Sequence, residues 1–134
     1  LYEAFNKARK AGKVRYYGFA THTNVPRVCE LAAAGGRCDV IMLAVNPNSL
    51  KELSPAIRKM RDSGIGLVSM KTSGPITKNP KVYDEHYDPV LGGMKLSPYQ
   101  RAYAYMLNAG GIDTFNSATP RSIARFLDAV SASM

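Results

Sequence analysis

The feature that constrains this chain most is a repeated alternation between short apolar runs and amphipathic segments with helical spacing. The run VIMLAV at 40–45 contains no polar residue, which is typical of a parallel strand buried on both faces. We also expect strands at 14–20 (VRYYGFA), at 65–70 (IGLVSM) and, more briefly, at 112–116. The first three runs begin at residues 14, 40 and 65, which is the spacing of successive β/α units.

Helices are predicted between these strands. The chain opens on one that ends near Gly12, and a second, ending at Gly35-Gly36, is expected to turn Val28, Leu31 and Ala32 inward. Three more helix starts are predicted where a serine or threonine that can act as a cap precedes a proline, at Ser54-Pro55, Ser97-Pro98 and Thr119-Pro120. Their expected inward residues are Leu53, Ile57 and Met60; Tyr99, Tyr103 and Met106; and Ile123, Phe126, Leu127 and Val130. The stretch 71–96 is expected to be a long irregular loop.

Strands that alternate with helices predict an α/β fold with a parallel sheet of four β/α units, in a single domain over 1–134. Such a sheet is either open and doubly wound or half of a closed (β/α)8 barrel, and the periodicity does not choose between them. In both architectures ligands bind at the carboxyl ends of the strands. We therefore look for a site in the segments that follow each strand.

Charge and composition narrow the classes of function. The net charge of +8 comes from lysines and arginines spread along the whole chain, which suits an enzyme that handles a phosphorylated anion at least as well as a nucleic-acid binder. Nucleic-acid binding is not expected, because the chain has no recognised binding motif and no cluster of basic residues. No apolar stretch approaches the roughly 20 residues of a membrane helix. Cys29 and Cys38 are expected to be buried, reduced thiols, which suits the cytoplasm. The chain begins without Met, so we expect a piece of a longer protein.

Several residues with reactive side chains have a plainer interpretation. His22 follows a strand and is expected either to face a ligand or to bond within its loop. His86 lies in YDEHYD at 83–88, but no second His or Cys stands at ligand spacing, so no metal site is predicted. Tyr16 and Tyr17 are expected to pack, one inward and one against the helices. Lys71, at the end of the third strand, is the strongest candidate for function.

Four segments in order resemble the aldo/keto reductase family. GKVRYYGFATH at 12–22 resembles the fifth strand of that barrel, and DVIM at 39–42, continued to Asn46-Pro47, resembles the sixth. GIGLVSMKT at 64–72 is similar to the seventh strand, while 111–114 and 117–120 stand where the eighth strand and its helix belong. The resemblance implies the C-terminal half of a TIM (β/α)8 barrel, and an oxidoreductase that uses NADPH to reduce a small carbonyl substrate.

The resemblance also implies a set of cofactor-binding residues. These are Thr21 and His22 after the fifth strand, Met70 against the nicotinamide ring, Lys71 and Thr72 near the pyrophosphate, and Ser117, Arg121 and Arg125 around the start of the last helix. An arginine near a helix N-terminus is well suited to a phosphate. Ala20 and Met42 stand where the family usually has Ser and Gln, which removes two polar contacts to the nicotinamide.

The family's catalytic Tyr, Lys, Asp and His come from earlier strands, and no residue here matches them. We therefore expect no catalytic residue in this chain and no activity from it alone. An alternative hypothesis is a freestanding, non-catalytic half-barrel that binds a phosphate or nucleotide, or that forms a homo-oligomer to cover its open sheet edges.

Overall fold

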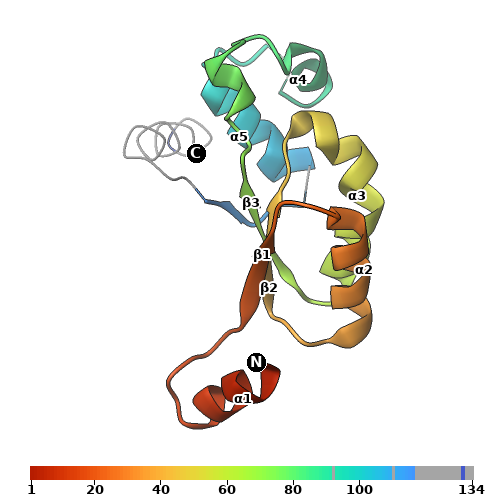
Figure 1. Ribbon diagram of the computed structural model, residues 1–134. Coiled ribbons are helices and arrows are strands. Elements are labelled where there is room, and N and C mark those ends of the chain that lie inside the picture. Colours follow the sequence, from red (N-terminus) through yellow and green to blue (C-terminus); the bar gives the residue numbers. More distant parts are fainter. Residues whose placement is uncertain (92, 110, 117–130, 132–134) are drawn as a thin grey trace.

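A computed structural model describes residues 1–91, 93–109, 111–116 and 131 (Figure 1). The elements run, in chain order, α1 (Tyr2–Lys10), β1 (Gly18–Thr21), α2 (Val25–Gly35), β2 (Val40–Ala44), α3 (Pro47–Asp62), β3 (Gly66–Met70), a 3-10 turn (Pro75–Thr77), α4 (Asp84–Leu91), α5 (Pro98–Ala109) and β4 (Thr114–Phe115). None of these helices is long and apolar enough to cross a membrane. The helix expected after Thr119 lies outside the described residues.

The four strands form one sheet in the order β1-β2-β3-β4, and every neighbouring pair is parallel. Gly18 stands opposite Val40, and Val40 stands opposite Gly66, so the strands begin at the same edge of the sheet. The predicted α/β fold with four parallel strands is therefore confirmed. All four carboxyl ends point to the opposite edge, which we call the carboxyl-end rim.

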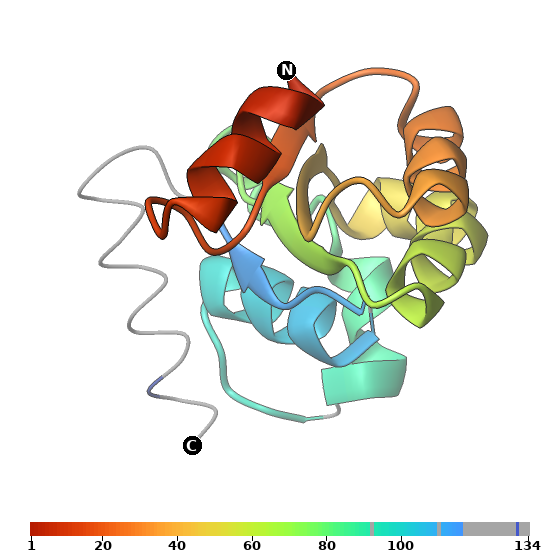
Figure 2. The same cartoon turned by 90° about the horizontal axis from the view of Figure 1, so that it is seen from below.

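Helices α2 and α3 lie side by side against one face of the sheet (Figures 1 and 2). Ile41, Leu43 and Leu67 point to this face and are fully buried. They form a core with the inward residues of the helices, which include Cys29 of α2 and Leu53, Ile57 and Met60 of α3. The inward face predicted for α3 is confirmed. An uninterrupted apolar stripe at helical spacing is removed from water only when that side of the helix packs against the core.

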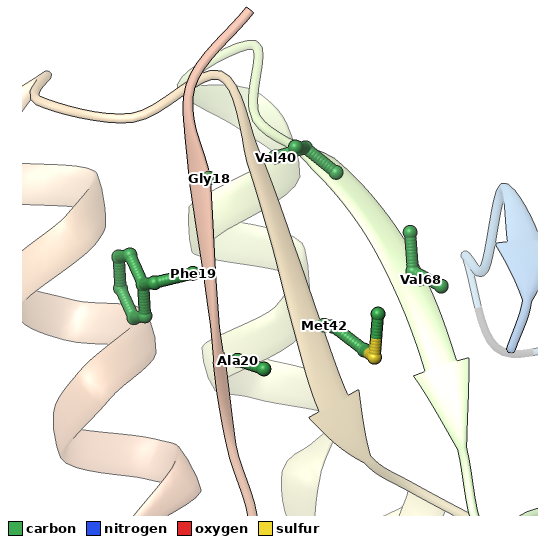
Figure 3. Close-up of a pocket in the computed structure, with 6 residues that line it drawn as sticks. All are labelled: Gly18, Phe19, Ala20, Val40, Met42 and Val68. Carbon is green, nitrogen blue, oxygen red and sulfur yellow. The ribbon is translucent and has the colours of Figure 1, made fainter. Parts of the chain in front are cut away.

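The other face of the sheet is apolar but only partly buried. Val40, Met42, Ala44 and Val68 point to it and keep intermediate exposure, whereas their neighbours along β2 and β3 are buried. A shallow hollow of about 370 Å³ lies here (Figure 3), lined by Gly18, Phe19, Ala20, Val40, Met42 and Val68. Phe19 points to the opposite side of β1 from Ala20.

Helix α3 starts eight residues earlier than expected, because its cap is Asn46 in place of Ser54. Asn46 caps it by accepting the backbone N–H groups of Asn48 and Ser49, and the Ser49 hydroxyl accepts the Asn46 N–H in return. Pro47 takes the first position, and Pro55 lies inside the helix. The Ser54 hydroxyl donates to the Leu50 carbonyl at 2.7 Å, so this serine is an interior residue and not a cap.

Strand β1 starts at Gly18 and not at residue 14, because its partner β2 begins only at Val40. The Tyr17 carbonyl accepts the N–H groups of Asp39 and Val40 just before the ladder begins. The prediction is wrong for Tyr16, which is 69% exposed, whereas Tyr17 packs against a helix as expected and stacks on Phe5 of α1 with ring centroids 4.3 Å apart. The prediction that Leu31 points inward is also wrong, since it is 54% exposed.

The segment 71–96 is not an irregular loop throughout, because it contains the 3-10 turn and α4. These elements pack on α5 around a second apolar cluster built from Ile76, Tyr83, Tyr87, Leu91, Ala102 and Ala104. Tyr103 and Met106 of α5 are buried as predicted, while Tyr99 is only partly buried.

The same polar contact occurs twice at the amino ends of the strands. In each case an aspartate before one strand accepts a backbone N–H at the start of the neighbouring strand and pairs with an arginine from the end of a helix. Asp39 accepts the Tyr17 N–H at 2.7 Å and pairs with Arg9. Asp113 accepts the Leu67 N–H at 2.7 Å and pairs with Arg61. The two halves of the sheet are thus fixed by equivalent interactions on the side away from the carboxyl-end rim.

Both cysteines are free thiols. Cys29 is fully buried as expected, whereas Cys38 is only partly buried. Burial raises the pKa of the Cys29 thiol, and burial followed by the nearby Asp39 carboxylate raises the pKa of Cys38. Both groups therefore stay protonated and weakly nucleophilic at neutral pH.

Candidate functional site

The residues that follow the strands lie along the carboxyl-end rim. Thr21 ends β1, Lys71 follows β3, and Asn116 follows β4 with its backbone N–H donating to the Ser69 carbonyl at 2.8 Å. The Val45 N–H donates to the Met70 carbonyl, which extends the pairing of β2 and β3 to the edge of the sheet. The parallel register thus places Thr21 and Lys71, both predicted site residues, on one rim.

Lys71 has a left-handed backbone, with a φ of +64°. A side chain with a Cβ pays roughly 1–2 kcal/mol in this region. The side chain is exposed, and its ammonium forms no ion pair with any described residue. An uncompensated positive charge at the end of a parallel strand is suited to an anion, and a lysine binds a phosphate as a point charge.

The residues on either side of Lys71 are fixed by buried hydrogen bonds. The hydroxyls of Ser69 and Thr72 both donate to the Val45 carbonyl, at 2.8 Å and 3.1 Å, and lie 2.6 Å from one another. The Tyr83 hydroxyl donates to the Thr72 carbonyl at 3.2 Å. Thr72 is only 3% exposed, so its hydroxyl supports the turn and is turned away from any ligand outside it.

Three other predicted residues lie near the rim with different surroundings. Met70 is 6% exposed and thus mostly covered. The Thr21 hydroxyl donates to the Thr23 carbonyl at 2.8 Å and accepts the Thr23 N–H, so it is engaged in its own turn. His22 is exposed. Ser117, Arg121 and Arg125, the expected phosphate contacts of the last helix, lie outside the described residues.

The second apolar cluster contains two buried tyrosines, and the sequence did not predict that one of them supports the turn at Thr72. Tyr83 and Tyr87 are buried at 0% and 1% exposure, and burial raises the pKa of Tyr83 to about 12. A tyrosine held neutral in this way acts as a hydrogen-bond donor. The only signal in the sequence is their separation by four residues, which places both on one helical face within an acidic segment.

His86 packs beside this cluster. Its Nε2 lies 2.8 Å from the Asn48 Oδ1, and its ring packs against those of Tyr83 and Tyr105. Within the described ranges, no three His, Cys, Asp or Glu side chains come together as a cation site would require.

A scan of the sequence against protein-family models gives no match, and a search of curated proteins gives none either. The aldo/keto reductase assignment is therefore carried by the four sequence segments alone and stays a prediction. The geometry adds Lys71, an exposed lysine on the rim with no ion-pair partner in the part of the chain that the structure describes, an arrangement suited to binding an anion.

Proposed function

We propose that this chain is the C-terminal half of an aldo/keto reductase-like (β/α)8 barrel and carries its NADPH-binding rim. The observation that carries the proposal is Lys71, an exposed cation that forms no ion pair with any described residue and is held at the carboxyl end of a parallel strand. Ligands of parallel α/β sheets bind at this end. Thr21 lies on the same rim, as the proposal requires.

The partly exposed apolar face of the sheet, opposite α2 and α3, supports the assignment to a half-barrel and not to a complete, independent domain. Parallel strands are normally buried on both faces. Here Val40, Met42 and Val68 keep intermediate exposure around the hollow in Figure 3. In a closed barrel these side chains would meet those of the opposite strands and fill the interior.

The roles of the individual residues follow from their surroundings. Lys71 contacts a phosphate of the cofactor. Thr72 acts indirectly, because its hydrogen bonds fix the turn that contains Lys71. NADPH, when bound, supplies the hydride for reduction of a small carbonyl compound. The proton donor for that reduction belongs to the missing half of the barrel, so the chain alone binds without catalysing. Free, protonated thiols at Cys29 and Cys38 fit a protein that works in the cytoplasm.

Titration of NADPH with the full chain, followed by the cofactor's fluorescence, tests the proposal. Wild type is expected to bind, and Lys71→Gln to bind on the order of tenfold more weakly, because one charge-assisted phosphate contact is lost. Lys78→Gln, which removes an exposed lysine seven residues further on, is the matched control and is expected to bind like wild type. An unchanged fluorescence signal, or equal affinities for the two variants, contradicts the proposal.

A second candidate is a freestanding half-barrel that associates with a copy of itself. The half-buried apolar face favours it, as does the outer edge of β1, which has no described neighbour in the sheet. Sedimentation equilibrium of the chain is then expected to show a dimer or larger assembly. A stable monomer at micromolar concentration counts against this candidate.

A further inference from the structure

We propose that Thr72 and Tyr83 are positioning residues that hold Lys71 in its left-handed conformation and so present its ammonium to a phosphate group. The inference rests on the proposed function for the identity of the ligand. Whether these two residues fix the backbone of Lys71 does not depend on the ligand, and it is tested separately.

The choice of lysine at this position is unusual for the chain. Four of the described glycines take up positive φ values, namely Gly12, Gly36, Gly64 and Gly111. Asn24 is the other described residue with a side chain at positive φ, and asparagine is several-fold enriched in this region relative to other residues with a side chain. Lysine is not among the residue types that favour it. At the tip of β3 the chain therefore keeps a strained residue whose replacement by glycine would relieve the backbone.

The strain persists because the turn is fixed on both sides. Ser69 and Thr72 are anchored to the Val45 carbonyl of the neighbouring strand. Tyr83, from a segment eleven residues further on, fixes the Thr72 carbonyl. The Tyr103 hydroxyl donates to the Ser73 hydroxyl at 3.1 Å and fixes the next residue as well. Between these anchors the chain has few ways to relax around Lys71.

The first arm of the test uses no ligand. Lys71→Gly is expected to raise the melting temperature of the chain by about 4 °C, because it relieves the strain. In a Thr72→Val background, where the turn is free to relax, the same change is expected to give no rise. Thr72→Ser keeps the hydroxyl and is expected to restore the wild-type response. Lys78→Gly is the matched control at a right-handed position, with a φ of −92°, and is expected to lower the melting temperature or leave it unchanged.

An equal rise from Lys71→Gly in the wild-type and Thr72→Val backgrounds, or no rise in wild type, overturns the proposal. Should Thr72→Val fail to fold, Tyr83→Phe takes its place, since it removes only the hydroxyl that fixes the Thr72 carbonyl.

The second arm measures NADPH affinity. Tyr83→Phe is expected to weaken binding about fivefold when Lys71 is present and to add no loss in a Lys71→Gly background. An equal loss in both backgrounds means that Tyr83 does not act through Lys71 and overturns the proposal. If wild type binds no NADPH while the first arm gives the expected result, the positioning stands and the proposed function is what fails.

Discussion

Replacing Asp39 with alanine is expected to lower the free energy of unfolding by about 2 kcal/mol. The Asp39 carboxylate accepts the Tyr17 N–H at 2.7 Å and pairs with Arg9. A hydrogen bond to a charged group contributes roughly 1.5–3 kcal/mol, and partial exposure of Asp39 favours the lower figure. The ion pair has side-chain exposures of 45% and 35%, so it contributes only about 0.5 kcal/mol. The backbone contact should therefore dominate.

Urea unfolding of three variants separates the two contributions. Asp39→Ala should lower the urea midpoint at an unchanged slope, by an amount that corresponds to about 2 kcal/mol in the free energy of unfolding. Arg9→Met should lower that free energy by only about 0.5 kcal/mol. The second half of the sheet supplies an internal control, because Asp113 makes the same contacts, and Asp113→Ala should match Asp39→Ala. If Arg9→Met costs as much as Asp39→Ala, the ion pair carries the energy and the reasoning is wrong.

Three further predictions follow from single residues. Burial raises the pKa of Tyr83 to about 12, from a value near 10 in the unfolded chain. Its contribution to stability should therefore be complete below pH 10 and fall as the pH rises towards 12. Denaturant midpoints measured against pH test this, and a flat profile would contradict it. Gly36→Ala should lower the free energy of unfolding by about 1 kcal/mol, because Gly36 has a φ of +54°. Gly35→Ala, one residue earlier and at a right-handed helical position, should not destabilise the chain. Equal effects of the two changes in thermal unfolding would exclude strain as the cause. Pro55→Ala should stabilise α3 by about 2 kcal/mol, because it restores the hydrogen bond to the Lys51 carbonyl, and a loss of stability in urea would contradict this.

The sheet could be predicted from the sequence because its signal is local. The run at 40–45 is apolar throughout, and a strand covered by helices on one side and apolar on the other has this pattern. The start of α3 was misplaced for an equally local reason. Ser54-Pro55 and Asn46-Pro47 carry the same capping pattern, and only the wider structure shows that the Ser54 hydroxyl bonds back to Leu50.

The candidate site could be predicted only in part. That Lys71 ends a strand follows from the sequence, but its left-handed backbone does not, because the contacts that impose it come from distant residues, Val45 and Tyr83. Helix α4 was missed because the polar and acidic residues of its segment are typical of a loop, while the buried pair Tyr83 and Tyr87 is a weak signal. Tertiary packing decided both features.

The most direct test of the account is a map of the backbone amide resonances that shift when NADPH is added to the chain. Binding at the carboxyl-end rim predicts that the largest shifts fall at 21–23 and 70–73, and that Asp39 and Asp113 at the other end of the strands are unaffected. Shifts centred on the two aspartates, or no shifts at millimolar NADPH, would contradict it.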